Sequence, residues 1–192
     1  MQVNLVGITK PSAYTECNTA EELVAWGARV SNPSNQNNTA TAPKLVGYLM
    51  RNQHWSPLEI VHVSMEIRTT RDIARQILRH RSFSFQEYSQ RYADPTQNLG
   101  FETRDARLQD TKNRQNSIAT SDMKLHEQWQ MKQAKVINEA LDAYTWAVSK
   151  GIAKEQARAV LPEGNTESVL IMAGTYQRWF GARKRTCTHA IS

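Results

Sequence analysis

Residues 79–92, RHRSFSFQEYSQRY, bring three arginines, one histidine, several hydroxyls and a carboxylate into one short stretch. Arg91 and a serine hydroxyl can serve phosphate oxygens, and an arginine can bind them through two parallel hydrogen bonds. Glu87 can accept a hydrogen bond from a sugar hydroxyl or orient a neighbouring base. Phe83 and Phe85 alternate with polar residues, which favours core packing over stacking on a ligand ring. The stretch therefore indicates a site for a nucleotide monophosphate.

The start of this stretch is predicted to lie on the last turn of a helix. Threonines at 69–70 can cap a helix that runs through Arg81, because apolar residues recur four positions apart along it. Gln76, Arg79 and His80 then share one face, whereas Arg81 turns to another side. Cations at a helix C-terminus also stabilise the helix by about 0.3–1 kcal/mol each, so a purely structural role for them stays open.

Hydrophobic periodicity and end signals predict the elements that must position these residues. The polar residues 93–120 are expected to form a loop with little regular structure. A long amphipathic helix is predicted to follow, from Ser121 to Gly151. The sequence further predicts strands at residues 2–8 and 61–67, and helices at residues 19–30, 43–53, 154–161 and 167–180.

The composition fits a globular chain with an affinity for anions. The chain has 192 residues, of which 40% are apolar, enough for one domain with a real core. A net charge of +6 suits nucleotides, phosphates or nucleic acid without choosing among them. Arg71, Arg75 and Arg79 form a stripe at helical spacing, which keeps a basic nucleic-acid-binding module open as an alternative. No recognised nucleic-acid motif accompanies that stripe.

Cysteine usage and hydropathy predict where the protein works. Cys17 and Cys187 have neither metal-ligand spacing nor the pattern of a disulfide framework, which favours a reducing cytoplasm and no metal site. The N-terminal residues lack a basic and an apolar signal region, and no apolar run approaches the roughly 18 residues of a membrane span. We therefore expect a cytoplasmic protein without a membrane anchor.

The order of the motif residues resembles a known family. Arg79-His80-Arg81, seven further residues and then Ser89, within E-x-S-x-R-Y, resemble the signature of the flavin-dependent thymidylate synthases. Three more segments resemble family stretches in the same order. They are ARVS at 28–31, HWSPLE at 54–59 and EQARAVLP at 155–162. The similarity covers roughly residues 1–175.

The resemblance implies an enzyme that methylates dUMP to dTMP. Methylenetetrahydrofolate would donate the carbon, and FAD reduced by NADPH would carry the hydride. It also implies an α/β (α+β) subunit, with an antiparallel sheet, flanking helices and a long helix in the second half, in a homotetramer with shared active sites. For dUMP it implies contacts from Gln76, Arg79, Glu87, Tyr88, Ser89, Gln90, Arg91 and Arg158, the last from a neighbouring subunit. For FAD it implies contacts from Arg79, His80, Arg81 and Glu87.

The C-terminal residues depart from the family pattern. Ser89 and Arg185 are the catalytic candidates, with Arg185 in the place of a family arginine that polarises the uracil, and Arg183 is a possible substitute. The family's tail with further glutamine and glutamate does not follow before Ser192, so we expect one domain whose end is irregular or shortened after about residue 175. This departure motivates a second interpretation: a protein with the family fold that binds FAD and dUMP with little turnover.

Overall fold

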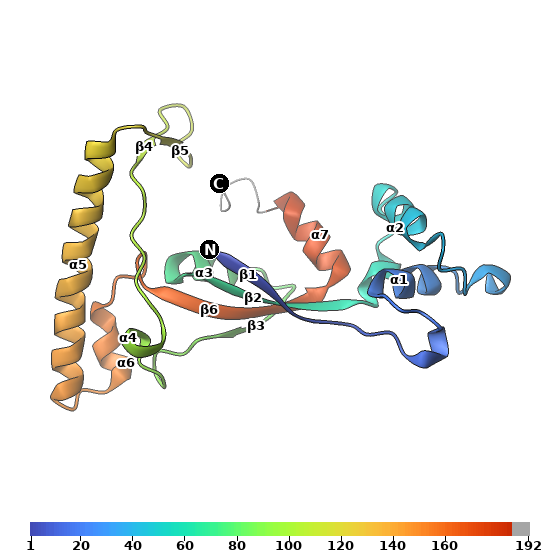
Figure 1. Ribbon diagram of the computed structural model, residues 1–192, viewed down its shortest axis with the longest axis horizontal. Helices are drawn as coiled ribbons and strands as arrows, with labels where there is room; N and C mark the ends of the chain where they lie inside the picture. The colour runs from blue at the N-terminus through green and yellow to red at the C-terminus, as the bar shows by residue number, and fades with distance from the viewer. Residues whose placement is uncertain (186–192) are drawn as a thin grey trace.

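The structure is a computed structural model that describes the backbone of residues 1–185 and the side chains of residues 1–181. A four-stranded antiparallel sheet forms its centre, in the order β1-β2-β6-β3 (Figure 1). The strands are β1 (Gln2–Ile8), β2 (His62–Thr70), β3 (Ser84–Glu87) and β6 (Glu167–Thr175). The predicted α/β fold with an antiparallel sheet is thus confirmed.

Strand β2 has the alternating pattern that the sequence predicts. Val63 and Ile67 are buried on one face, while His62 and Arg68 are exposed on the other. A strand with one buried face shows this period of two, because successive side chains point to opposite sides of the sheet.

The prediction of a helix at residues 167–180 is wrong over its first half. Residues Glu167–Thr175 form β6, which pairs with β2 on one side and β3 on the other. Its middle part, residues 169–173, is a continuous apolar run because a central strand is partly covered on both faces, and periodicity cannot distinguish such a run from a helix. A helix does follow as α7 (Tyr176–Arg185).

Helix α3 (Arg71–Ile77) is shorter than predicted and ends before the arginine-rich triplet. The chain then leaves the helix through successive turns, in which the Arg79 N–H donates to the Gln76 carbonyl and the His80 N–H to the Ile77 carbonyl. The triplet therefore does not lie on a helical turn, and its side chains are not bound to helical spacing. Thr70 is the N-cap residue, within the predicted 69–70 pair.

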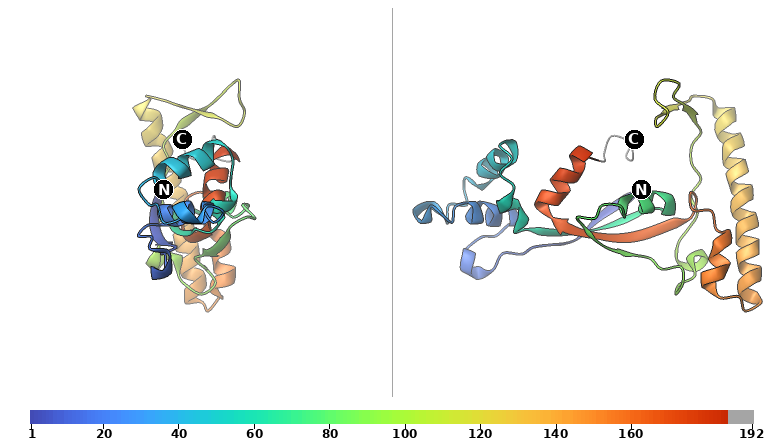
Figure 2. Two further views of the ribbon diagram at one scale, coloured as in Figure 1. Left: turned by 90° about the vertical axis from the view of Figure 1, so that its right-hand side faces the viewer. Right: turned by 180° about the vertical axis from the view of Figure 1, so that it is seen from behind.

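Helices lie at both ends of the sheet and on one of its faces. Helices α3 and α7 lie on the same face, while α1 and α2 lie beyond one end and α5 and α6 beyond the other (Figures 1 and 2). These helices are α1 (Ala20–Ala28), α2 (Ala42–Arg51), α5 (Met123–Ser149) and α6 (Lys154–Ala157), which continues as a 3-10 turn, η4 (Arg158–Val160). The long helix in the second half and the short helix before Pro162 are confirmed.

Side-chain capping explains where two of these helices begin. The Thr19 hydroxyl accepts from the Glu22 N–H, as the predicted capping box requires, although the Glu22 carboxylate accepts from the Asn18 N–H, one residue earlier than expected. Asp122 accepts from the Leu125 N–H and starts α5.

Residues 93–120 carry more structure than expected. They contain a helical turn, α4 (Pro95–Asn98), and a small hairpin of β4 (Arg107–Gln109) and β5 (Ser117–Ala119). The Asp110 carboxylate closes the hairpin by accepting from the Lys112 and Asn113 N–H groups.

Within residues 1–185, no helix is both long enough and apolar enough to cross a membrane.

Candidate functional site

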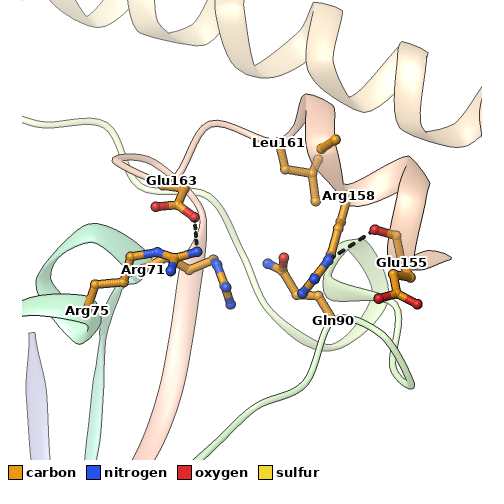
Figure 3. A pocket seen from close by; sticks show the side chains of 8 residues that line it. Arg71, Arg75, Gln90, Glu155, Arg158, Leu161 and Glu163 are labelled. Atoms are coloured by element: carbon orange, nitrogen blue, oxygen red, sulfur yellow. Dashed lines mark hydrogen bonds and ion pairs between the residues drawn. The ribbon is translucent and has the colours of Figure 1, made fainter. Parts of the chain in front are cut away.

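A pocket of about 280 Å³ lies at the sheet end where β2 runs into α3 and β6 begins. It is open on one side, and arginines from two separate segments line it. Arg71 and Arg75 enter from α3, while Gln90 and Arg158 enter from the opposite side (Figure 3). The remaining lining residues are Glu155, Ala159, Leu161 and Glu163.

Gln90 is a lining residue whose side-chain amide nitrogen lacks a hydrogen-bond partner in the described part of the chain. Only 3% of the residue is exposed, and its Nε2 has no hydrogen-bond partner among the described residues. An unsatisfied buried amide costs roughly 1–3 kcal/mol, so native proteins rarely keep one without a reason. A ligand oxygen in the pocket would satisfy it once the amide turned towards the pocket, because Nε2 itself is buried.

Glu87 lies behind the pocket and is held from two sides. Its Oε1 accepts from the Ser168 hydroxyl at 2.9 Å and lies 3.6 Å from Arg71 Nη1. The sheet register explains this, because Glu87 pairs with Leu170 and shares the α3-covered face with Ser168 and Leu170. The motif carboxylate is therefore joined to a lining arginine.

The other two arginines of the pocket are restrained by glutamates. Arg75 donates to the Glu163 carboxylate, and this hydrogen bond raises the pKa of the Arg75 guanidinium above its ordinary value. Arg158 Nε donates to the Glu155 carbonyl at 3.2 Å, which leaves its two terminal nitrogens available. The pocket thus offers several cationic donors to an anion.

The packing of α5 against α6 and η4 fixes the Arg158 side of the pocket. Tyr144 and Ala147 of α5 form a buried cluster with Ala157 and Leu161, on either side of Arg158. The backbone that carries Arg158 is therefore part of a packed layer.

Comparison with known proteins places this geometry in a family. A sequence model described as "Thymidylate synthase complementing protein" matches residues 13–192. The chain belongs to this family. A probable flavin-dependent thymidylate synthase of Paramecium bursaria Chlorella virus 1 is 45% identical over 179 residues, which are 93% of this chain and 81% of the viral protein. A flavin-dependent thymidylate synthase of Synechocystis sp. is 42% identical over 192 residues, 99% of this chain and 86% of the relative.

The fold of this family member also matches a solved structure. The crystal structure of the UMP/dUMP methylase PolB from Streptomyces cacaoi, bound with 5-Br dUMP, superposes with a TM-score of 0.72 at 27% identity. The match covers 94% of this chain and 75% of the methylase. The resemblance inferred from the motifs is therefore confirmed.

Among the predicted site residues, the structure brings three together in or beside the pocket. Gln90 and Arg158 line it, and Glu87 adjoins it through Arg71. Because Gln90 and Arg158 belong to one chain here, they can share a ligand without a second subunit. A contact from Arg158 to a neighbouring subunit's ligand stays a prediction.

The predicted residues around the arginine-rich turn do not line this pocket. Gln76, Arg79 and Arg81 are exposed, and neither arginine forms an ion pair within the described part of the chain. His80 is half-buried, with its ring 6.1 Å from that of Phe83 in an edge-to-face arrangement. These side chains form a second cationic surface, away from Gln90.

Three motif residues after β3 make local contacts. The Tyr88 hydroxyl donates to the Asp94 carbonyl at 3.2 Å, so this side chain braces the following turn. The Ser89 carbonyl accepts from Tyr92 and Ala93, while its hydroxyl has no partner among the described residues. The Arg91 guanidinium lies over the ring of Tyr92, 5.8 Å from its centre. Ser89 and the exposed Arg91 therefore keep their hydrogen-bonding groups available to a ligand.

Both C-terminal candidates lie outside the described side chains. Arg183 and Arg185 belong to α7 by their backbone, and nothing is known of where their guanidinium groups lie.

Sequence reasoning missed Arg71 and Arg75 as pocket residues. The signal was present in their spacing of four residues, but the stripe was interpreted as an exposed face. Arg71 is in fact buried, so the stripe is not one continuous surface for nucleic acid. Within residues 1–185, no three His, Cys, Asp or Glu side chains gather as a metal site would require.

Proposed function

We propose that this chain is a flavin-dependent thymidylate synthase that methylates dUMP to dTMP, with methylenetetrahydrofolate as carbon donor and FAD reduced by NADPH as hydride carrier. The observation that carries the proposal is the pocket beside the motif, which is lined by the Gln90 amide and by Arg158, whose two terminal nitrogens are available. The names of two relatives at 42–45% identity support the same reaction.

The pocket is suited to the phosphate of dUMP. Arg158 and Arg75 supply positive charge from opposite sides, and Gln90 supplies a neutral donor beside Arg158 (Figure 3). A dianionic phosphate has three terminal oxygens, which such donors can share through charge-assisted hydrogen bonds. Ser89 would place its hydroxyl towards the pyrimidine as a catalytic residue, and Arg185 would polarise the uracil.

The exposed cationic surface is suited to FAD. Arg79 and Arg81 are exposed and form no ion pair in the described part of the chain, and His80 adds a ring nitrogen, so the donor set matches the diphosphate of a dinucleotide. When bound there, FAD supplies the hydride that completes the new methyl group. The residues present therefore fit the cofactor.

The separation of the two surfaces favours an active site shared between subunits. Arg71 and Arg75 line the pocket, whereas Gln76 and Arg79 do not, which supports a site that a second copy of the chain completes. A homotetramer would bring Gln76 and Arg79 of one copy to the pocket of another. Exposed apolar side chains on β1 and α5 are suited to such contacts; they include Val3, Leu5, Val6, Trp129 and Trp146.

The experiment is an assay of dTMP formation with FAD, NADPH and methylenetetrahydrofolate. Arg158→Gln should raise the KM for dUMP by about 10- to 100-fold, because it removes a charge-assisted hydrogen bond. Lys150→Gln is the matched control, since it removes one exposed cation outside the pocket.

The outcomes separate the alternatives. No dTMP from wild-type protein that binds FAD and dUMP would favour the interpretation of a family-fold protein with little turnover. Protein that binds neither compound would refute the proposal, and salt-sensitive DNA binding by such protein would favour a nucleic-acid-binding module. The cytoplasmic location stays a prediction.

A further inference from the structure

Arg104 lies in the segment between α4 and β4, and its backbone and side chain contact two different helices. Gln133 of α5 holds the backbone, because its Oε1 accepts from the Arg104 N–H and its Nε2 donates to the Arg104 carbonyl, each at 2.9 Å. The guanidinium contacts the first turn of α3, where Nη2 lies 2.7 and 2.8 Å from the two carboxylate oxygens of Asp72. Arg104 therefore joins α5 to α3.

The contact at the start of α3 includes a third side chain. Arg104 Nη2 also donates to the Thr70 hydroxyl at 2.8 Å, and that hydroxyl donates to Asp72 Oδ1 at 2.6 Å. Burial alone would raise the pKa of the Asp72 carboxyl, but the hydrogen bonds from Thr70 and Arg104 hold it below its ordinary value. The pair is partly exposed, with 45% of the Arg104 side chain accessible, and such pairs add little stability. The contact instead fixes the orientation of α3 relative to residue 104.

Helices α3 and α5 support opposite sides of the pocket. Arg75 enters from α3, whereas the backbone that carries Arg158 is packed against α5. Gln133 Oε1 also accepts from Asn165 Nδ2 at 3.1 Å, and Asn165 lies in the turn between η4 and β6. Together with the bonds of Arg104, these contacts run from one side of the pocket to the other. A misplacement of about 1 Å by a mutation far from the chemistry can cost an enzyme about 100-fold in rate.

We propose that Arg104 is a positioning residue for the nucleotide site: it sets how far α3 lies from the layer of α5 and η4, and therefore how far Arg75 lies from Arg158 across the pocket. This inference rests on the proposed function, because it takes the pocket as part of the site for dUMP. Arg104 is not among the described residues that line the pocket, so it acts through the elements that it joins. It also lies outside the sequence motifs.

Three substitutions separate positioning from a purely structural role. Arg104→Gln removes the charge and shortens the side chain that contacts Asp72, whereas Arg104→Lys keeps the charge without the planar fork. Asp72→Asn removes the partner's charge and keeps an oxygen that can accept from Thr70. Arg107→Gln is the matched control, because Arg107 is an exposed arginine of the same loop whose two hydrogen bonds go to Ser117 within the hairpin.

Calorimetric titration of the FAD-loaded proteins with dUMP, together with steady-state kinetics, supplies the test. Arg104→Gln should weaken dUMP binding and raise the KM for dUMP by about 10-fold, while the KM for NADPH stays within about twofold. Arg104→Lys should recover part of the loss, and Arg107→Gln should match wild type. The double variant with Asp72→Asn should bind dUMP no more weakly than the weaker single variant, because both changes break one contact.

A merely structural role would lower the melting temperature and the fraction of active enzyme without changing the affinity for dUMP, and that result would overturn the inference. Additive effects of the two substitutions on dUMP binding would overturn it as well. Should Arg104→Gln fail to fold, Arg104→Lys and Asp72→Asn are measured in its place.

Crystal structures of wild type and Arg104→Gln, or Arg104→Lys, give a readout that does not depend on the nucleotide. The distance between the Cα atoms of Arg75 and Arg158 should differ by about 1 Å between them, and an unchanged distance would contradict the inference. Wild-type protein that does not bind dUMP would instead refute the proposed function, and the Cα distance would still decide the role of Arg104.

Discussion

At the scale of single residues, the ring of Phe83 supports the turn that carries the arginine-rich triplet. Phe83 is buried against Trp179 at 5.0 Å between ring centres, and it meets the edge of His80. It also lies directly over Gly174 of β6, where a Cβ atom would come within 2.5 Å of the Phe83 ring. Position 174 therefore needs a residue without a side chain.

Gly174→Ala should displace Phe83 and destabilise the protein by about 1–3 kcal/mol, as overpacking of a core does. Because His80 packs on the same ring, FAD affinity should fall as well. Denaturant unfolding and flavin titration measure the two effects. Gly164→Ala is the control, since a Cβ there meets nothing within 4 Å, and it should be near neutral. Equal stability of the two variants would show that the Phe83 contact is unimportant.

At the scale of elements, the sequence predicted the strand that has one buried face, but it did not predict the strand that is covered on both faces. Strand β2 alternates and was predicted at residues 61–67, one residue early at its start and three residues short at its end, whereas β6 was predicted as a helix. That error hid the site, because Ser168 on β6 and the turn before it bring Glu87 and Arg158 to α3. The motif predicted which segments carry the chemistry. It could not predict that Arg71 is buried, because that burial depends on how β6 pairs in the sheet.

One buried polar side chain of α5, Gln133, forms hydrogen bonds to two other segments of the chain. Gln133 Oε1 accepts from the Arg104 N–H at 2.9 Å and from Asn165 Nδ2 at 3.1 Å, while its Nε2 donates to the Arg104 carbonyl at 2.9 Å. Asn165 lies in the turn between Arg158 and β6. Gln133 therefore connects α5, the segment around Arg104 and the turn beside the pocket.

Gln133→Ala should cost about 1–3 kcal/mol of stability, because it leaves the backbone groups of Arg104 unsatisfied. Gln130→Ala, three residues earlier on the exposed side of α5, should change stability by less than about 0.5 kcal/mol. Urea unfolding of the two variants gives the comparison. If Gln130→Ala were as destabilising as Gln133→Ala, the loss would reflect the helix alone and not this connection.

At the scale of the whole molecule, the chain is elongated, with the sheet between two groups of helices and the pocket at one end (Figures 1 and 2). The pocket of about 280 Å³ within one subunit offers room for a phosphate but not for FAD and folate as well. The sequence alone could not reveal this, because sharing of sites depends on how copies pack. The expectation that active sites are shared between subunits came from the family resemblance.

The phosphate position is tested most directly by a crystal structure of the protein with FAD and 5-bromo-dUMP, in which anomalous scattering from bromine locates the base. We predict the phosphate within hydrogen-bond distance of the Gln90 amide and the Arg158 guanidinium. A nucleotide bound elsewhere, with this pocket holding only water, would contradict the proposed function of these residues.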